Sequence, residues 1–366
     1  MQFDQGPANT EIVTKIRRRE EIGYSHNQSS GCEQAQMIDV KMWGHALNRM
    51  PKLSQSEWQA LDPVAKWLIA SRASVLFMTF TAAALGGLMA WRAGVFQWDL
   101  WLATVFGLMF AHATNNLLND YTDSRRGIDK ENYYRNQYGV HVLEDGLMDE
   151  PQFWRYVGVT AGIALALGGW LVYQRSGLTF DLMLAGAFFV LFYTWPLKYY
   201  GLGEPAVLLV WGPLMVGGSF YVLAGFWSWD VTWLSLVFAL GPTTVLFGKH
   251  TDKLDADKAK GVNTLPVILG EKISRYAVLA MMVAQYLLCI GLVVTGSFAW
   301  PLLLVLASLN SMPRLFSLYS EPKPEEPPQN YPEGIWPLWF SAQAFRHTRR
   351  FTSLFLVGVI LDTLIA

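Results

Sequence analysis

The stretch NNLLNDYTDSRRGID, residues Asn115 to Asp129, follows a run of mostly apolar residues that begins near residue 98. Helical spacing places Asn116, Asp120 and Asp123 on one face of a helix. Gly127 then ends that helix, so a segment that starts in lipid finishes in a group of carboxylate and amide oxygens. Such donors suit a hard cation such as Mg2+, although Asp and Asn also occur as simple caps at helix ends.

The composition indicates a polytopic membrane protein. Apolar residues make up 52% of the chain and charged residues only 16%, with 16 Trp, 15 Tyr and 21 Phe. A soluble domain of this length carries more charge. The two cysteines, Cys32 and Cys289, predict no disulfide framework, and the polar first thirty residues lack the apolar core of a cleavable signal peptide.

We predict two regions. Residues 1–64 are polar, and we expect them to be partly disordered, with short interfacial helices over 36–64 whose side chains Met42, Trp43, Leu47 and Trp58 face lipid headgroups. Residues 65–366 contain nine apolar segments. The length of each segment is close to the roughly 20 residues that are needed to cross a bilayer. The predicted fold is all-α, a polytopic membrane protein with nine transmembrane helices enclosing a central cavity. The segments are 67–91, 98–120, 154–173, 179–198, 204–226, 229–249, 274–295, 298–318 and 348–366.

Basic residues predict the orientation in the bilayer. Lys and Arg gather in the loops that share a side with the N-terminus, whereas the connections on the other side offer only Arg92 and Arg175. The positive-inside rule therefore places the N-terminus and the charged loops in the cytoplasm. We expect an integral protein of the inner (cytoplasmic) membrane, with both acidic stretches at cytoplasmic helix ends.

A second acidic stretch, KHTDKLDADKAKGVNTLPVILG, runs from Lys249 to Gly270 at the end of the sixth apolar segment. Asp252 and Asp255 are three residues apart, so they can share a helix face. Asp257 joins that face only if the helix has ended or distorted. Because this stretch and the first one end on the same side of the membrane, the sequence predicts two Mg2+ sites facing each other.

This pairing fits the ionisation of a diphosphate ester. Metal ions neutralise the charge that grows on the leaving group, and basic side chains assist; the basic candidates are Arg72, Arg126, Lys198 and Lys258. The allylic cation left behind needs a water-poor chamber and gains from aromatic faces. Candidate lining residues, each of which has core or lipid packing as its alternative, are Tyr121, Tyr193, Trp195, Tyr199 and Trp211.

These motifs resemble the UbiA superfamily of intramembrane prenyltransferases. NDYTDSRRGID (Asn119 to Asp129) is similar to the family's Asn-Asp-x-x-Asp motif, and its Gly-x-Asp ending resembles the dihydroxynaphthoate branch. The stretch from Asp252 to Leu265 is similar to the second motif, and YTWPLKYYGLGE (Tyr193 to Glu204) to the connection between the fourth and fifth helices. The resemblance implies nine helices, Mg2+ as cofactor, and transfer of a polyprenyl group from its diphosphate to an aromatic acceptor.

Carried over residue by residue, the resemblance implies three sets of site residues. The predicted metal ligands are Asn119, Asp120, Asp123 and Asp129 for one Mg2+, and Asp252, Asp257 and the additional acid Asp255 for the other. The predicted catalytic residues are Asp120, Asp123, Asp252, Asp257, Lys198 and Arg72. The resemblance also implies that Asn119 and Arg126 contact diphosphate or substrate, and the reading of the residues adds Asn116, Tyr193 and Lys258 to these contacts.

The second motif departs from the family pattern. Asp252 and Asp257 are five residues apart where the family usually has four, so which acids pair is left open. Lys249 and His250 precede the motif where the branch usually has Asn and Arg. His250 is either a proton acceptor near the aromatic substrate or a satisfied polar residue of the core.

Several functional alternatives follow. The acceptor most in keeping with the motifs is a dihydroxynaphthoate-type quinone precursor, as in menaquinone biosynthesis. The same chemistry on 4-hydroxybenzoate, homogentisate or a chlorophyllide-like alcohol is the alternative. A membrane transporter is disfavoured because the acids cluster at helix ends, whereas transporter sites usually lie near the midplane. We expect a lipid bilayer around the protein and no nucleic-acid partner, and the oligomeric state is left open.

Overall fold

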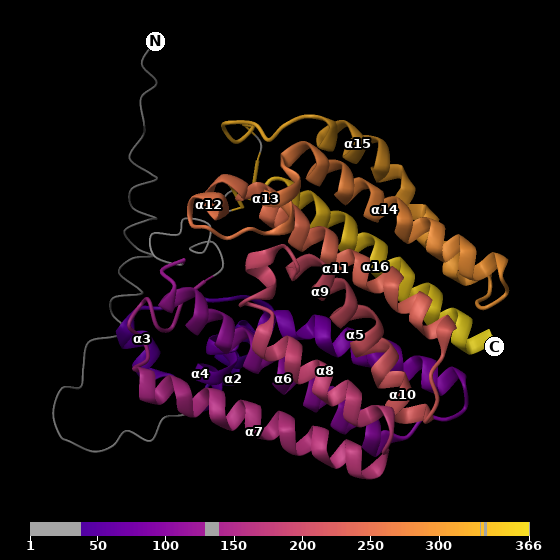
Figure 1. Ribbon diagram of the computed structural model, residues 1–366, viewed down its shortest axis with the longest axis horizontal. Helices are drawn as coiled ribbons and strands as arrows, with labels where there is room; N and C mark the ends of the chain where they lie inside the picture. Colours follow the sequence, from indigo (N-terminus) through magenta and orange to yellow (C-terminus); the bar gives the residue numbers. More distant parts are fainter. Residues whose placement is uncertain (1–37, 129–138, 330, 333–334, 366) are drawn as a thin grey trace, which may run out of the picture. The chain divides into compact units, whose positions relative to one another are not determined.

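The computed structural model describes residues 38–128, 139–329, 331–332 and 335–365 (Figure 1). The predictions for residues 1–37 and for Asp129 fall outside these ranges. The chain from Ile38 onward forms one compact unit, and every regular element among its described residues is a helix. The all-helical prediction is therefore confirmed for the described chain.

Three short helices precede the long ones: α2 (Val40–Asn48), α3 (Gln55–Ala60) and α4 (Pro63–Ala70). The Asp62 carboxylate caps α4 by accepting from the backbone N–H groups of Val64 and Ala65, as an N-cap residue does. It also accepts from the indole N–H of Trp43, which ties α2 to α4. We expected Trp58 to face lipid headgroups, but it is 1% exposed and belongs to the apolar core around these helices.

The first half of the helical bundle consists of five elements. They are α5 (Ala73–Arg92), α6 (Trp98–Arg125), α7 (Glu150–Gln174), α8 (Leu178–Phe192) and the 3-10 turn η2 (Leu197–Tyr200). Helix α6 packs along α7 and also contacts α5 and α8. These helices lie together in the lower part of Figure 1.

The second half begins with α9 (Gly203–Leu209), the π-helical segment η3 (Val210–Gly217) and α10 (Gly218–Ala224). Pro213 lies inside η3, and the missing proline N–H accounts for the departure from α-helical bonding there. The remaining elements are α11 (Trp229–Asp252), α12 (Leu254–Ala259), α13 (Leu265–Leu269), α14 (Glu271–Val294), η4 (Trp300–Ser311), α15 (Met312–Ser320) and α16 (Phe340–Ile365). Helix α11 packs against both α14 and α16.

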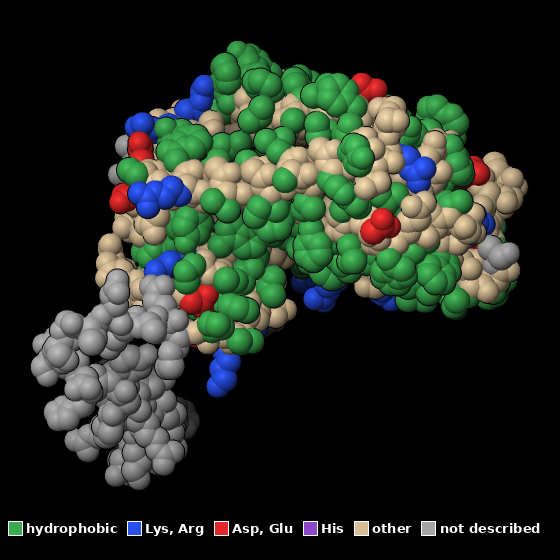
Figure 2. Space-filling view, turned by 90° about the horizontal axis from the view of Figure 1, so that it is seen from below, with side chains coloured by type: hydrophobic (Ala, Val, Ile, Leu, Met, Phe, Trp, Pro, Cys, Tyr) green, Lys and Arg blue, Asp and Glu red, His purple; other side chains and the backbone are tan. Residues whose placement is uncertain are grey.

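Six helical stretches are long and apolar enough to cross a bilayer: 73–92, 150–174, 203–224, 229–252, 271–294 and 300–320. Helix α8 is apolar but has 15 residues, and α6 and α16 have 28 and 26 residues but include polar positions. Large apolar side chains such as Phe77, Leu165 and Val294 are exposed. Figure 2 shows hydrophobic side chains over most of one face of the molecule, as expected where lipid replaces water.

Candidate active site

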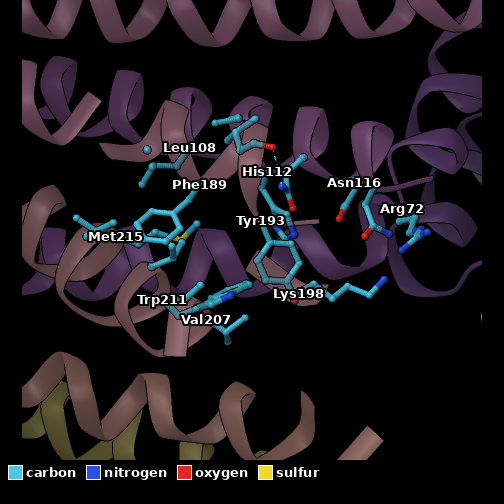
Figure 3. Close-up of a pocket in the computed structure, with 18 of the residues that line it drawn as sticks. Arg72, Leu108, His112, Asn116, Phe189, Tyr193, Lys198, Val207, Trp211 and Met215 are labelled. Atoms are coloured by element: carbon cyan, nitrogen blue, oxygen red, sulfur yellow. Dashed lines mark hydrogen bonds between the residues drawn. The ribbon is translucent and has the colours of Figure 1, made fainter. Parts of the chain in front are cut away.

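A cavity of about 320 Å³ lies between α6, α8, the α9–η3 helix and the end of α11. Figure 3 shows its polar end at Arg72 and Asn116 and its apolar end at Phe189 and Met215, with Tyr193 and Lys198 between them. A cavity with one charged end and one apolar end matches a ligand that has a charged head and a hydrocarbon tail.

Arg72 is placed at the polar end by a break in the first membrane segment. Its backbone adopts φ 55° and ψ 52° between α4 and α5, a left-handed conformation that costs a non-glycine residue roughly 1–3 kcal/mol. The guanidinium forms an ion pair with Asp120 of α6, whose side chain is 3% exposed. The strained backbone thus directs a cation at the first acidic stretch.

The asparagines of α6 hold the surrounding chain in place. The amide of Asn116 donates to the carbonyl of Ser71, and Asn119 Oδ1 accepts from the hydroxyl of Thr194. Both asparagines line the cavity. Their oxygens and nitrogens therefore connect α6 to the segments that precede α5 and follow α8.

Asp123 and Lys198 form a buried ion pair inside the cavity. The Lys198 ammonium lies 3.1 Å and 2.8 Å from the two carboxylate oxygens of Asp123. Burial lowers the pKa of Lys198, but Asp123, together with Tyr193 and Asp257, raises it by more, so the net shift is upward and the ammonium stays charged. Lys198 lies on the η2 turn, outside the long helices.

The second acidic stretch adopts a different arrangement from the predicted one. Helix α11 ends at Asp252, Lys253 interrupts the helix, and α12 begins at Leu254. Asp252 and Asp255 therefore belong to two different helices, and the shared helix face that their spacing allowed does not form. Asp252 is buried, whereas Asp255 is exposed.

The Asp252 carboxylate contacts the first turn of α16. Oδ1 accepts from the backbone N–H of Phe340 at 2.8 Å and Oδ2 from that of Ser341 at 2.9 Å. The first N–H groups of a helix have no partner inside the helix, and a buried carboxylate satisfies them. Asp252 does not line the cavity, whereas Asp123 of α6 does.

The residues of the second stretch that line the cavity are basic. Lys249, His250 and Lys253 line the cavity, and the Lys253 ammonium lies 2.7 Å from the buried carboxylate of Asp257. Lys258, predicted to contact diphosphate, is exposed and lies outside the lining.

The connections that carry the two acidic stretches pack against each other. Ile128, Tyr199 and Val262 form a small buried cluster, and the Lys260 ammonium donates to the carbonyl of Ile128. The Arg126 guanidinium lies 4.9 Å from the ring centres of both Trp195 and Tyr199, where it makes cation–π contacts. It is exposed and is not part of the cavity lining.

His250 is held in one orientation by a carboxylate. Its Nδ1 lies 2.6 Å from Oε1 of Glu204, and both side chains are 2% exposed. Oε2 of Glu204 also accepts from the backbone N–H of Leu265. A carboxylate that binds one ring nitrogen fixes the ring and leaves the other nitrogen for a second partner.

Two of the five predicted aromatic lining residues border the cavity, Tyr193 and Trp211. Of the others, Tyr121 packs against Phe153 and Trp154, and Trp195 and Tyr199 contact Arg126. Sequence reasoning missed several lining residues: His112, Phe189, Lys249 and Lys253. The basic residues of KHTDK are plain in the sequence, but no local pattern shows that they face the cavity.

The oxygen donors at the polar end fit a hard cation. Asn119 and Asp123 line the cavity, and Asp120 lies beside them in its ion pair with Arg72. Among the residues that the structure describes, no three His, Cys, Asp or Glu side chains lie close enough to form a metal cluster. A metal at this end would therefore need amide and diphosphate oxygens among its ligands, which Mg2+ accepts.

Known proteins share this fold. A structure reported for digeranylgeranylglyceryl phosphate synthase in membranes matches with a TM-score of 0.58 at 17% identity, covering 82% of this chain and 98% of that one. A UbiA homolog from Archaeoglobus fulgidus bound to DMAPP and Mg2+ matches with a TM-score of 0.50 at 12% identity, covering 80% and 99%.

Sequence comparisons give the same family. UbiA prenyltransferase domain-containing protein 1 of Danio rerio is 28% identical over 69% of this chain and 77% of its own length. The 2-carboxy-1,4-naphthoquinone phytyltransferase of Synechocystis sp. is 25% identical over 66% and 78%. The model of the UbiA prenyltransferase family matches residues 78–342. The chain therefore belongs to the UbiA prenyltransferase family, and it is an integral membrane prenyltransferase.

Proposed function

We propose that the protein transfers a polyprenyl group from its diphosphate to a dihydroxynaphthoate-type aromatic acceptor, with Mg2+ as cofactor. The observation that carries this proposal is the cavity, in which Asp123 and the cations Arg72 and Lys198 lie at one end of an apolar chamber. The Synechocystis phytyltransferase supports the naphthoate acceptor, and the Archaeoglobus homolog bound to DMAPP and Mg2+ supports the donor and the metal.

The first acidic stretch is the proposed metal site. Asn119, Asp120 and Asp123 would hold Mg2+, with Asp129, which lies outside the described residues, as the further predicted ligand. Bound Mg2+ supplies positive charge that neutralises the diphosphate as the C–O bond breaks. Arg72 and Lys198 would donate to the same diphosphate oxygens.

The apolar end of the cavity has a separate task. When the C–O bond breaks, its electron pair leaves with the diphosphate and an allylic cation remains. Phe189, Tyr193 and Trp211 border this space, where their ring faces would stabilise the cation and the surrounding helices would exclude water. A carbon of the acceptor ring then supplies the electron pair of the new C–C bond.

His250 is the residue that we propose for the proton released by the acceptor. It lines the cavity, and Glu204 fixes its ring through Nδ1. A neutral imidazole held in this way accepts a proton at Nε2, and the neighbouring carboxylate stabilises the resulting cation. The alternative reading, a polar residue satisfied by Glu204 alone, predicts no effect of His250 on turnover.

We also propose nine membrane spans, with the N-terminus and the polar end of the cavity in the cytoplasm, in the inner membrane. The proposed spans are the six apolar helices and, in addition, α6, α8 and α16. The bias of Lys and Arg toward the loops on the N-terminal side supports this orientation.

The decisive experiment is an in vitro transfer assay. Purified full-length protein is incubated with Mg2+, a labelled C20 prenyl diphosphate and a panel of acceptors: dihydroxynaphthoate, 4-hydroxybenzoate, homogentisate and chlorophyllide. We expect prenylated naphthoate, detected by mass, and loss of product on titration with EDTA. A product with another acceptor alone would move the assignment to that acceptor, and activity that survives chelation would contradict the metal proposal.

A matched pair of variants tests the site in the same assay. Asp123→Asn should abolish transfer, because it removes charge from the cavity while keeping the shape. It should also lower stability, because the Lys198 ammonium loses its buried partner, so transfer is measured on protein that is shown to be folded. The control is Asp181→Asn, which changes an exposed carboxylate near the start of α8 and should leave transfer unchanged. Folded protein that gives no product with any acceptor would favour the transporter reading.

A further inference from the structure

The second acidic stretch lines the cavity with basic side chains. Its residues at the cavity wall are Lys249, His250 and Lys253, although the sequence of the stretch contains three aspartates. Lys198 reaches the same cavity from the η2 turn and is buried there. Three lysines therefore face the space opposite α6, where a second Mg2+ site was expected.

Each aspartate of the stretch has a different position. Asp252 is directed at α16, where it accepts the N–H groups of Phe340 and Ser341. Asp255 is exposed. Asp257 is buried, and its Oδ1 accepts a hydrogen bond from the Lys253 ammonium. No described residue donates a hydrogen bond to its Oδ2.

One free carboxylate oxygen beside lysines is a poor site for a divalent cation. Mg2+ prefers several oxygen ligands in an octahedral arrangement, with carboxylates to offset its charge. The Lys253 ammonium at the same place repels a dication. The residues of the second stretch therefore do not fit the second metal that the two-site prediction required.

We infer that the diphosphate of the proposed substrate is bound by a single divalent ion at the α6 end and by Lys249 and Lys253 at the α11 end, where the lysines take the place of a second metal. This inference deepens the proposed function and rests on it. An ammonium group has three donors, so Lys253 can bind Asp257 and a diphosphate oxygen at once. Charge-assisted hydrogen bonds of this kind are short and strong.

Asp257 then acts as a positioning residue. Its Oδ1 holds the Lys253 ammonium at the cavity wall, four residues back along the chain. The negative charge of Asp257 also offsets part of the repulsion among the clustered lysines. Asp252 has a similar role, because its bonds to α16 fix the end of α11, which carries Lys249 and is followed directly by Lys253.

The test counts bound metal with Mn2+ as the probe. Full-length protein in lipid nanodiscs is saturated with inorganic pyrophosphate and titrated with Mn2+, and bound ions are counted by electron paramagnetic resonance. We expect one Mn2+ per chain and a spectrum without Mn–Mn coupling. Two coupled Mn2+ per chain would overturn the inference even if the protein transfers prenyl groups. A folded chain that binds no pyrophosphate would overturn both this inference and the proposed function.

Variants separate the two halves of the site. Lys249→Met and Lys253→Met should each weaken pyrophosphate binding about tenfold or more while one Mn2+ remains bound at saturating pyrophosphate. Lys253→Arg keeps the charge and should lose less. The matched control is Lys272→Met, an exposed lysine in the first turn of α14, which should bind as the wild type does. Unchanged binding in both methionine variants would contradict the role of the lysines.

A gain-of-function variant completes the test. Lys253→Asp places a second carboxylate next to Asp257 at the cavity wall and removes a competing cation. We expect this variant to bind a second Mn2+ in the presence of pyrophosphate. Retention of a single Mn2+ with unimpaired pyrophosphate affinity would show that Lys253 does not occupy the position of a metal.

Discussion

Oδ2 of Asp123 lies 2.8 Å from Nζ of Lys198, and the two residues are 75 positions apart in the chain. This ion pair joins the end of α6 to the turn after α8 at the polar end of the cavity. Both side chains are less than 10% exposed, so neither charge is screened by water. The pair therefore affects both the stability of the fold and the proposed diphosphate site.

Lys198→Met should destabilise the protein by about 3–5 kcal/mol, because it leaves the Asp123 carboxylate buried without its partner. The double variant Asp123→Asn/Lys198→Met should recover most of that loss. Chemical unfolding in detergent, followed by Trp fluorescence, measures both. If the double variant is no more stable than Lys198→Met, the two charges are not coupled.

Asp252→Ala should lower stability by about 1–2 kcal/mol by removing the cap of α16 and should keep measurable prenyl transfer. Asp123→Asn, in contrast, should lose transfer completely. Unfolding midpoints and initial rates distinguish these effects, with the exposed Asp255→Ala as control. Complete loss of transfer in a normally stable Asp252→Ala protein would restore the sequence-based prediction that Asp252 binds metal.

His250→Ala should reduce kcat by about 10²-fold or more if the imidazole accepts the acceptor's proton. Glu204→Gln should give a smaller decrease, because it keeps a hydrogen-bonding partner for the ring but removes the charge that stabilises the imidazolium. Single-turnover kinetics separate this step from product release. A normal rate in His250→Ala would leave only the packing role.

Gly186→Phe should shorten the longest prenyl chain that the enzyme accepts. A side chain on Gly186, which lines the cavity, meets no atom within 4 Å at its Cβ, so the ring would project into the space for the tail. We expect KM for a C20 prenyl diphosphate to rise about tenfold or more and KM for a C5 donor to change little.

The control for this prediction is Gly169→Phe, at an exposed position of α7 that also has open space at its Cβ. It should leave both KM values unchanged. An equal rise in KM for long and short donors in Gly186→Phe would indicate a general distortion of α8.

The shared helix face of the first acidic stretch could be predicted from the sequence because its geometry is local. The i, i+4 and i+7 spacing of Asn116, Asp120 and Asp123 belongs to one helix, and α6 continues through all three. Composition and hydropathy also predicted membrane helices, six of which are present by length and apolar character among the described residues. Both signals depend on a few neighbouring residues or on averages over a segment.

The positions of the aspartates in the second stretch could not be predicted, because its geometry depends on distant residues. Nothing in the sequence around Asp252 shows that the N–H groups of Phe340 and Ser341, 88 and 89 positions later, lie beside it. Trp58 was placed at the membrane surface for a related reason, since an aromatic residue near a polar region suits either an interface or a buried contact.

By itself, the sequence determined that this chain is a helical membrane protein with the motifs of the UbiA prenyltransferase family, because periodicity and composition act over short distances. The tertiary structure alone decided which charges face the cavity. The N–H groups at the start of α16, which have no partner inside their helix, bind Asp252, and Lys253 binds Asp257. Helix packing therefore leaves lysines, in place of carboxylates, opposite the acids of α6.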